Sequence, residues 1–217
     1  VPEGHVTDDG RYLIITLKEG FDTNAVDILD LRQKNAKPRR VFAKWDAFYT
    51  FLGSRGDDLY FQTTNEAPLG RIIAVDAKQP APSHWRTIVP QSDMALESTS
   101  YIAGRFITSY VRDAHSLVRL YERDGRLAGE VKLPGLGYVE GFTGSGEDRE
   151  SFGVAQTARE QALSRAVGVV LVDGASQRIA HRIADARITG RCAGDIEFAV
   201  AIERDVLQRV RVRAIQL

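Results

Sequence analysis

The chain has 217 residues, of which 27% are charged, and its 29 Lys and Arg residues balance 29 Asp and Glu residues. This length suffices for one large domain or two small ones, and the composition is that of an ordinary globular protein. Zero net charge argues against nucleic acid or a membrane surface as a partner, because both usually need a basic excess. No apolar run approaches the roughly 18 residues of a membrane span, and no segment has the order of a signal peptide.

Cys192 is the only cysteine, so no internal disulfide can form. A lone thiol agrees with a reducing compartment, and we expect a soluble protein that is cytoplasmic rather than periplasmic. The chain begins at Val1 without an initiator methionine, which predicts a mature product or a fragment.

One unit recurs through the first half of the chain. It consists of a turn, an apolar strand, a loop and a second apolar strand that ends in an acidic residue. Runs of β-branched and aromatic residues between turn signals are typical of strands. The three copies are Asp8–Arg11, Tyr12–Leu17 and Val26–Asp30; then Gly56–Asp58, Leu59–Thr64 and Arg71–Asp76; then Ala103–Arg105, Phe106–Val111 and Leu117–Glu122.

The spacing of these units is regular. The terminal acids Asp30, Asp76 and Glu122 lie 46 residues apart. An aromatic residue near the start of the first strand recurs at Tyr12, Tyr60 and Phe106, in steps of 48 and 46 residues, and further steps of 46 reach Phe152 and Phe198. A period of roughly 40 to 50 residues with several short strands is typical of four-stranded propeller blades.

A hairpin follows the third unit. Asp124-Gly125 predicts a tight turn, because glycine tolerates the positive φ that such turns need, and a strand is expected over Arg126–Leu133. All seven prolines fall in predicted loops, as expected for a residue that cannot donate to a sheet ladder.

The composition changes near residue 151. Residues 151–217 contain ten Arg but no Lys, Pro, Trp or Tyr. An alanine-rich stretch, Thr157–Ala166, predicts a helix, and the strands expected after it are Val167–Asp173, Arg178–Ile183, Ile196–Ile202 and Val206–Ile215. We therefore divide the chain into propeller blades at 1–152 and a second part at 153–217, which is either further divergent blades or an unrelated α+β tail.

Several segments in the first part resemble the propeller of the prolyl oligopeptidase family of serine peptidases, through about residue 152. Their order and spacing carry the resemblance more than any one of them does. The matching segments are Thr7–Tyr12 with Lys18–Gly20, Thr64–Pro68 running into Arg71–Asp76, and Tyr110–His115 through Asp124-Gly125 to Leu133–Gly137 and Gly141–Gly144. The chain departs from the family pattern at Val26–Ile28 and from Gly153 onward.

The resemblance implies a seven-bladed propeller that covers an α/β-hydrolase domain and admits short peptides, which are cut after proline. The Ser, His and Asp of that chemistry lie in the hydrolase domain, where a Gly-x-Ser-x-Gly elbow exposes the nucleophile. No such motif occurs in this chain, and Ser145 in Thr143–Gly146 lacks the first glycine. No catalytic residue is therefore expected.

Other candidate residues have structural explanations. The four histidines are isolated and none has metal-ligand spacing to another; they are His5, His84, His115 and His181. Within Asp113–Ser116 we expect local bonds to the backbone rather than a triad. Turn chemistry explains the acidic pairs Asp8-Asp9 and Asp57-Asp58. The glycine-rich segments Gly53–Gly56 and Gly135–Gly137 lack the other residues of a phosphate-binding loop. We expect Arg39-Arg40 to be solvated, Cys192 to be a packed or surface thiol, and Trp45 and Trp85 to seal blade edges. We expect no catalytic, cofactor or metal residue.

The fold class expected is all-β, a partial propeller with about three clear blades and as many as five. Fewer than seven blades would leave an open arc with unpaired strand edges, which favours a fragment. The predicted function is that of a substrate-gating propeller without a nucleophile. The alternative is a free-standing propeller that binds a protein partner.

Overall fold

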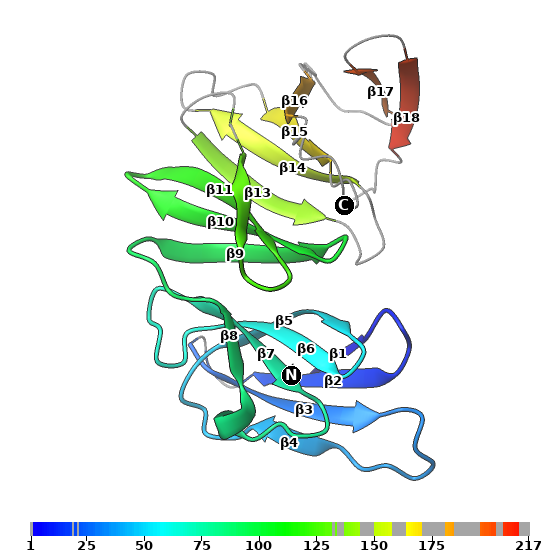
Figure 1. The fold of residues 1–217 in the computed structure, drawn as a ribbon, viewed down its shortest axis with the longest axis vertical. Helices are drawn as coiled ribbons and strands as arrows, with labels where there is room; N and C mark the ends of the chain where they lie inside the picture. Colours follow the sequence, from blue (N-terminus) through cyan, green and yellow to red (C-terminus); the bar gives the residue numbers. More distant parts are fainter. Residues whose placement is uncertain are drawn as a thin grey trace.

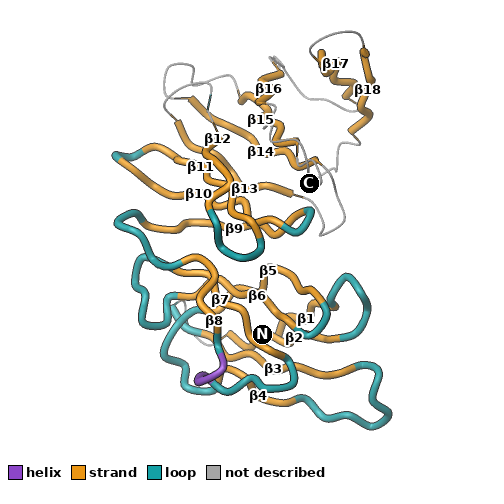
Figure 2. Tube along the Cα trace, in the orientation of Figure 1, coloured by secondary structure: helices purple, strands orange, loops and turns teal. Residues whose placement is uncertain are grey.

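The computed structural model describes residues 2–18, 20, 22–131, 133, 137–143, 150–157, 164–170, 181–184, 196–202 and 206–212. Within these ranges the chain is built from strands and connecting loops, with one short 3-10 helix at Pro82–His84 (Figures 1 and 2). The expected all-β class is confirmed.

Three four-stranded antiparallel sheets follow one another along the chain, and in each sheet every strand pairs with the next in sequence. Sheet 1 contains β1 (Pro2–Val6), β2 (Tyr12–Lys18), β3 (Asn24–Asp30) and β4 (Arg39–Phe42). Sheet 2 contains β5 (Tyr49–Arg55), β6 (Asp58–Thr63), β7 (Arg71–Asp76) and β8 (Arg86–Val89). Sheet 3 contains β9 (Ala95–Ile102), β10 (Arg105–Arg112), β11 (His115–Glu122) and β12 (Leu127–Val131).

Two further sheets contain the later strands. Sheet 4 contains β13 (Gly137–Thr143), β14 (Glu150–Thr157), β15 (Ser164–Val170) and β16 (His181–Ala184), and β17 (Ile196–Ile202) pairs with β18 (Val206–Val212). The helix predicted over Thr157–Ala166 is wrong at both ends, because Thr157 ends β14 and Ser164 begins β15; residues 158–163 lie outside the described residues. Alanine content misled the prediction, since strand pairing decides the conformation of short segments more than helix propensity does.

Strand pairing shows which positions of the repeat are equivalent. The acids Asp30, Asp76 and Glu122 end β3, β7 and β11, and they pair with Tyr12, Asp58 and Arg105 respectively. The 46-residue period of the acids is therefore a true structural repeat. The spacing of the aromatic residues is not a structural repeat. By the same pairing, the residues that occupy the position of Phe106 in sheets 1 and 2 are Leu13 and Leu59, not Tyr12 and Tyr60. A one-residue offset moves a side chain to the opposite face of a strand.

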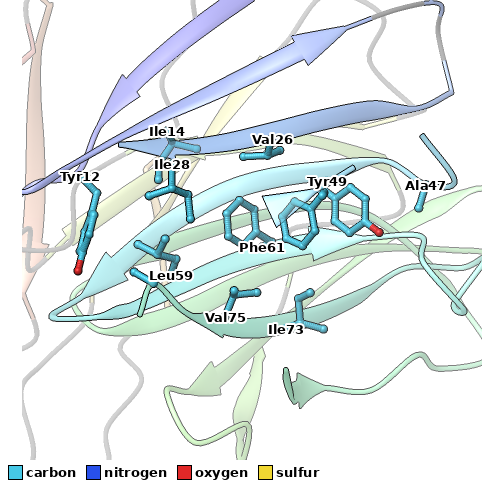
Figure 3. Close-up of a cluster of buried hydrophobic side chains, with 12 residues drawn as sticks. Tyr12, Ile14, Val26, Ile28, Ala47, Tyr49, Leu59, Phe61, Ile73 and Val75 are labelled. Carbon is cyan, nitrogen blue, oxygen red and sulfur yellow. The ribbon is translucent and has the colours of Figure 1, made fainter. Parts of the chain in front are cut away.

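The hydrophobic core lies between the sheets. Each buried cluster is made by the facing sides of two successive sheets (Figure 3 shows the first). The first cluster contains Tyr12, Ile14, Val26, Ile28 and Phe42 from sheet 1, and Ala47, Tyr49, Leu59, Phe61, Ile73, Val75 and Ala77 from sheet 2 and the linker before it. The second contains Tyr60, Ile72, Ala74 and Val89 from sheet 2 with Tyr101, Phe106, Tyr110 and Tyr121 from sheet 3, among others.

Sheet 2 is thus buried on both faces. Leu59 and Phe61 face sheet 1, whereas Tyr60 between them faces sheet 3. This arrangement explains why β6 and β7 read as continuous apolar runs rather than as alternating patterns. Burial of a side chain such as Phe61, which is fully inaccessible, contributes about 1.5–3 kcal/mol. Backbone hydrogen bonds hold the strands of one sheet together, and the apolar side chains on the facing sides hold neighbouring sheets together.

A strained hairpin joins β10 and β11. Arg112 pairs with His115 across a two-residue turn in which Asp113 and Ala114 have φ of 48° and 60°. Both central residues of such a turn have positive φ, for which Asn-Gly is favoured. We expect Ala114→Gly to raise the free energy of unfolding by about 0.5–1 kcal/mol, because alanine is strained there. Urea unfolding measures it; Ala43→Gly, at an exposed linker position without positive φ, should not stabilise the chain.

Candidate functional site

The first strands of successive sheets lie beside one another. β5 lies against β9, and β9 against β13. In Figure 1 β5 and β9 face each other in the middle of the view, whereas β4 lies at its lower edge. The His5 ring of β1 is 5.2 Å from the Phe51 ring of β5, centroid to centroid. These first strands, which we call the inner strands, form one continuous wall and are the candidate functional surface.

Polar side chains link this wall across sheets 3 and 4. Tyr138 of β13 donates a hydrogen bond to the Glu97 carboxylate of β9. The Ser100 hydroxyl donates to the Phe142 carbonyl at 2.6 Å. Glu97 and Tyr138 are exposed, so the inner strands present a carboxylate and a phenol at their surface. Sequence reasoning missed these residues because the Leu-Glu-Ser-Thr-Ser pattern of β9 has the polarity of a loop.

Gly53 lets two inner strands approach closely. A Cβ at Gly53 would lie 2.6 Å from Cδ1 of Tyr101, and the Tyr101 ring is buried against Tyr60 and Phe106 at centroid distances of 4.9 and 5.0 Å. Within the glycine-rich segment Gly53–Gly56, it is therefore Gly53 that serves packing between sheets 2 and 3, because a Cβ at Gly56 would meet nothing within 4 Å.

Asp57 connects sheets 1 and 2. It lies in the turn between β5 and β6, and its carboxylate is 2.6 Å from Arg11 Nη1 and 2.6 Å from Lys78 Nζ. Tyr12 also donates a hydrogen bond to it at 2.6 Å. The bond from Lys78, followed by that from Tyr12, lowers the pKa of the Asp57 carboxyl, whereas burial and then the Asp57 bond raise the pKa of Tyr12. Turn chemistry alone, as predicted from sequence, does not account for this residue.

We expect Asp57→Asn to lower the free energy of unfolding at neutral pH by about 1–2 kcal/mol, because it removes a partly buried ion pair with Arg11 and a more exposed one with Lys78. A lowered pKa in the folded state stabilises the protein above the ordinary Asp pKa, and that contribution is lost as pH falls through the folded-state value. The wild-type chain should therefore lose more stability on acidification than the variant does. Urea unfolding from neutral to acidic pH measures this; Asp93→Asn, an exposed linker residue, should leave the pH slope unchanged.

A second connection lies at the other end of the same boundary. The Asn24 side chain, which is inaccessible to solvent, accepts a hydrogen bond from Tyr49 N and donates one to Tyr49 O, both at 2.7 Å. Asn24, Gly70 and Ser116 lie 46 residues apart. Ser116 Oγ likewise accepts a bond from Val139 N of β13, at 3.0 Å. At Gly70 the backbone supplies the link, since Leu96 N donates to Leu69 O at 2.7 Å.

The structure places the remaining candidates from the sequence apart from one another. His115 Nδ1 contacts the Asp113 carbonyl at 3.3 Å, while Ser116 bonds to sheet 4, so this loop forms no triad. His84 is exposed in the 3-10 helix, and His181 begins β16. Ser145 and Cys192 lie outside the described residues.

Two basic residues and two tryptophans have defined positions. Arg39 and Arg40 are exposed, as expected, but Arg39 donates to the Ala77 and Lys78 carbonyls and Arg40 pairs with Asp27. Trp85 packs on the first cluster with its ring 5.2 Å from that of Phe42, which agrees with sealing of a sheet edge. Trp45 is half-buried in the linker before β5.

The described residues show neither a metal-ion site nor a membrane-spanning helix. No group of three or more His, Cys, Asp or Glu side chains among these residues is arranged to bind a metal ion. In the same part of the chain no helix has the length and apolar character that crossing a membrane requires.

Repeated four-stranded antiparallel sheets, packed face to face with their first strands side by side, define a β-propeller, of which this chain is a part. Residues 2–154 match the family model described as the prolyl oligopeptidase N-terminal beta-propeller domain. The chain belongs to the prolyl oligopeptidase family. The resemblance stated from the sequence motifs is confirmed.

Curated relatives match only part of their own length. The prolyl endopeptidase of Elizabethkingia miricola is 28% identical over 149 residues, which cover 69% of this chain and 21% of that protein. Prolyl oligopeptidase A of Galerina marginata is 30% identical over 126 residues, covering 55% of this chain and 17% of that protein. The chain spans about a fifth of the length of the prolyl endopeptidases that it matches.

Solved structures of prolyl oligopeptidases are similar to this chain in fold. A structure from a study of two prolyl endopeptidases and their inter-domain dynamics has a TM-score of 0.70 and 31% identity, over 77% of this chain and 25% of that chain. The apo form of prolyl oligopeptidase B from Galerina marginata has a TM-score of 0.73 at 18% identity, over 83% of this chain and 26% of that chain. The second similarity is one of fold.

Proposed function

We propose that this chain is part of the propeller that controls access of short peptides to the α/β-hydrolase domain of a prolyl oligopeptidase-like serine peptidase. The observation that carries the proposal is the match of residues 2–154 to the family propeller, combined with the clusters that bury both faces of sheets 2 and 3. Such packing makes a stiff wall whose inner strands exclude large substrates. The chain itself supplies no nucleophile to this chemistry.

We also infer that residues 153–217 continue the propeller and do not form a separate α+β tail. Sheet 4 supports this inference because it spans the boundary: β14 runs from Glu150 to Thr157 and pairs with β13 before it and β15 after it. Val139 and Phe142 of β13 complete a buried cluster with sheet 3, as earlier sheets do with each other.

An activity assay tests the proposal. The chain alone, incubated with a Gly-Pro reporter peptide, should release no product. Cleavage that a serine-directed inhibitor abolishes would contradict the non-catalytic role.

The coding sequence on both sides of this segment separates the two functions. A downstream hydrolase domain with a Gly-x-Ser-x-Gly elbow agrees with the gating propeller. A stop codon directly after this segment in an intact gene would contradict it and favour the free-standing protein-binding propeller.

A further inference from the structure

The loop between β3 and β4 concentrates positive charge in a chain whose net charge is zero. Residues 31–40 contain five Arg or Lys residues and no acid. The structure divides these five into two groups. Both arginines of β4 have partners: Arg39 donates hydrogen bonds to the Ala77 and Lys78 carbonyls, and Arg40 forms an ion pair with Asp27. Arg32, Lys34 and Lys37, in the loop, are exposed, and Arg32 also interacts electrostatically with Asp9 in the turn between β1 and β2.

The neighbouring acid is engaged by the loop itself. Asp30 Oδ1 accepts a hydrogen bond from Arg32 N at 3.0 Å, and Oδ2 accepts one from Gln33 Nε2 at 2.9 Å. Leu31 N donates to Arg11 O at 2.8 Å, which fixes the loop to the turn between β1 and β2. The backbone at Leu31–Gln33 is therefore ordered by these bonds, which lowers the backbone entropy that binding of a partner would remove.

The loop is also prominent. It spans residues 31–38, compared with 77–85 in sheet 2 and 123–126 in sheet 3, and it projects at the lower right of Figure 1. Leu31 has 45% of its surface exposed beside these cations. A surface with exposed cations and an exposed apolar side chain fits a partner that has both carboxylates and an apolar group.

We infer that loop 31–38 docks an acidic protein segment that carries an apolar side chain. Opposite charges steer such a partner and set its orientation, and Leu31 adds an apolar contact. A nucleic acid fits less well, because acids lie near the basic loop: the turns beside it at the same end of the sheets carry Asp8, Asp9, Asp57 and Asp58. Connections at the opposite end carry acids as well, namely Asp22, Asp46, Glu66, Asp93 and Asp113. The inference does not depend on the gating function.

The probe is a fluorescein-labelled peptide of glutamate and leucine residues, titrated with the chain and followed by fluorescence anisotropy. Lys34→Glu should weaken binding about tenfold, since it replaces an attraction by a repulsion. Lys44→Glu, which makes the same change at an exposed residue of the opposite end, should leave it unchanged. Leu31→Ser should weaken binding at every salt concentration, because it removes an apolar contact. Raising the salt concentration from about 0.05 M to about 0.5 M should weaken the wild-type complex, because salt screens the attraction between charges.

Three outcomes would overturn the inference: equal weakening by Lys34→Glu and Lys44→Glu, tighter binding of a single-stranded DNA of the same length, or no binding of the acidic peptide at low salt. Circular dichroism of each variant shows that the sheets are intact, so loss of binding reports on the loop. These outcomes leave the reporter-peptide assay of the proposed function unaffected.

Discussion

Gly125→Ala should lower the free energy of unfolding by about 3–5 kcal/mol, because a side chain at this position collides with the neighbouring sheet. A Cβ on Gly125 would lie 1.9 Å from the Ile88 carbonyl oxygen and 2.9 Å from its carbon. Ile88 belongs to β8, at a bulge between Thr87 and Val89, and both of these neighbours pair with β7, so the obstacle is backbone that is held on either side. The turn between β11 and β12 would have to move away from sheet 2. Urea unfolding monitored by circular dichroism measures the loss.

Gly10→Ala is the matched control. Gly10 has φ of 67°, in the same left-handed region as the 88° of Gly125, but a Cβ there would meet nothing within 4 Å. It should cost only the backbone strain, about 1 kcal/mol. Equal losses in the two variants would mean that the turn does not contact β8.

Asn24→Ala should lower the free energy of unfolding by about 2–4 kcal/mol. The substitution leaves both the N–H and the C=O of Tyr49 without the side-chain partner that each has at 2.7 Å. Tyr49 is buried, so water cannot replace these bonds without opening the boundary between sheets 1 and 2. Asn24→Asp should not rescue the loss, since a carboxylate would face the Tyr49 carbonyl. Chemical denaturation measures both variants.

Asn65→Ala provides the comparison for this experiment. Asn65 is a half-buried loop residue whose side-chain oxygen accepts one bond from Arg71 at 3.2 Å within the same sheet. Its removal should cost about 1 kcal/mol or less. If Asn24→Ala is no more destabilising than this change, the buried link between the sheets does not have the role assigned to it.

The sequence predicts the second and third strands of sheets 1 to 3 well. In sheet 2 these strands, β6 and β7, are buried on both faces, so their apolar runs are clear against the turns around them. The Asp124-Gly125 turn was also predicted, because it depends on local backbone preference; Gly125 has φ of 88°.

The inner strands were harder to predict for a physical reason. They lie at the edges of their sheets, and polar residues such as Glu97 and Ser100 interrupt their apolar pattern. The contacts between sheets were not predictable at all from local spacing. Asp57 reads as a turn residue, and only the packing of sheet 1 against sheet 2 brings Arg11 and Tyr12 to it.

A double-mutant cycle tests most directly whether successive sheets pack face to face as propeller blades. Phe42 of sheet 1 and Phe61 of sheet 2 have ring centroids 4.9 Å apart, whereas Phe106 belongs to the next cluster. Substitution of Phe42 and Phe61 by leucine should show a coupling of about 0.5–1.5 kcal/mol in the free energy of unfolding. Phe42 and Phe106 should be additive within about 0.5 kcal/mol. Additivity of the first pair, or equal coupling in both, would contradict the arrangement of blades.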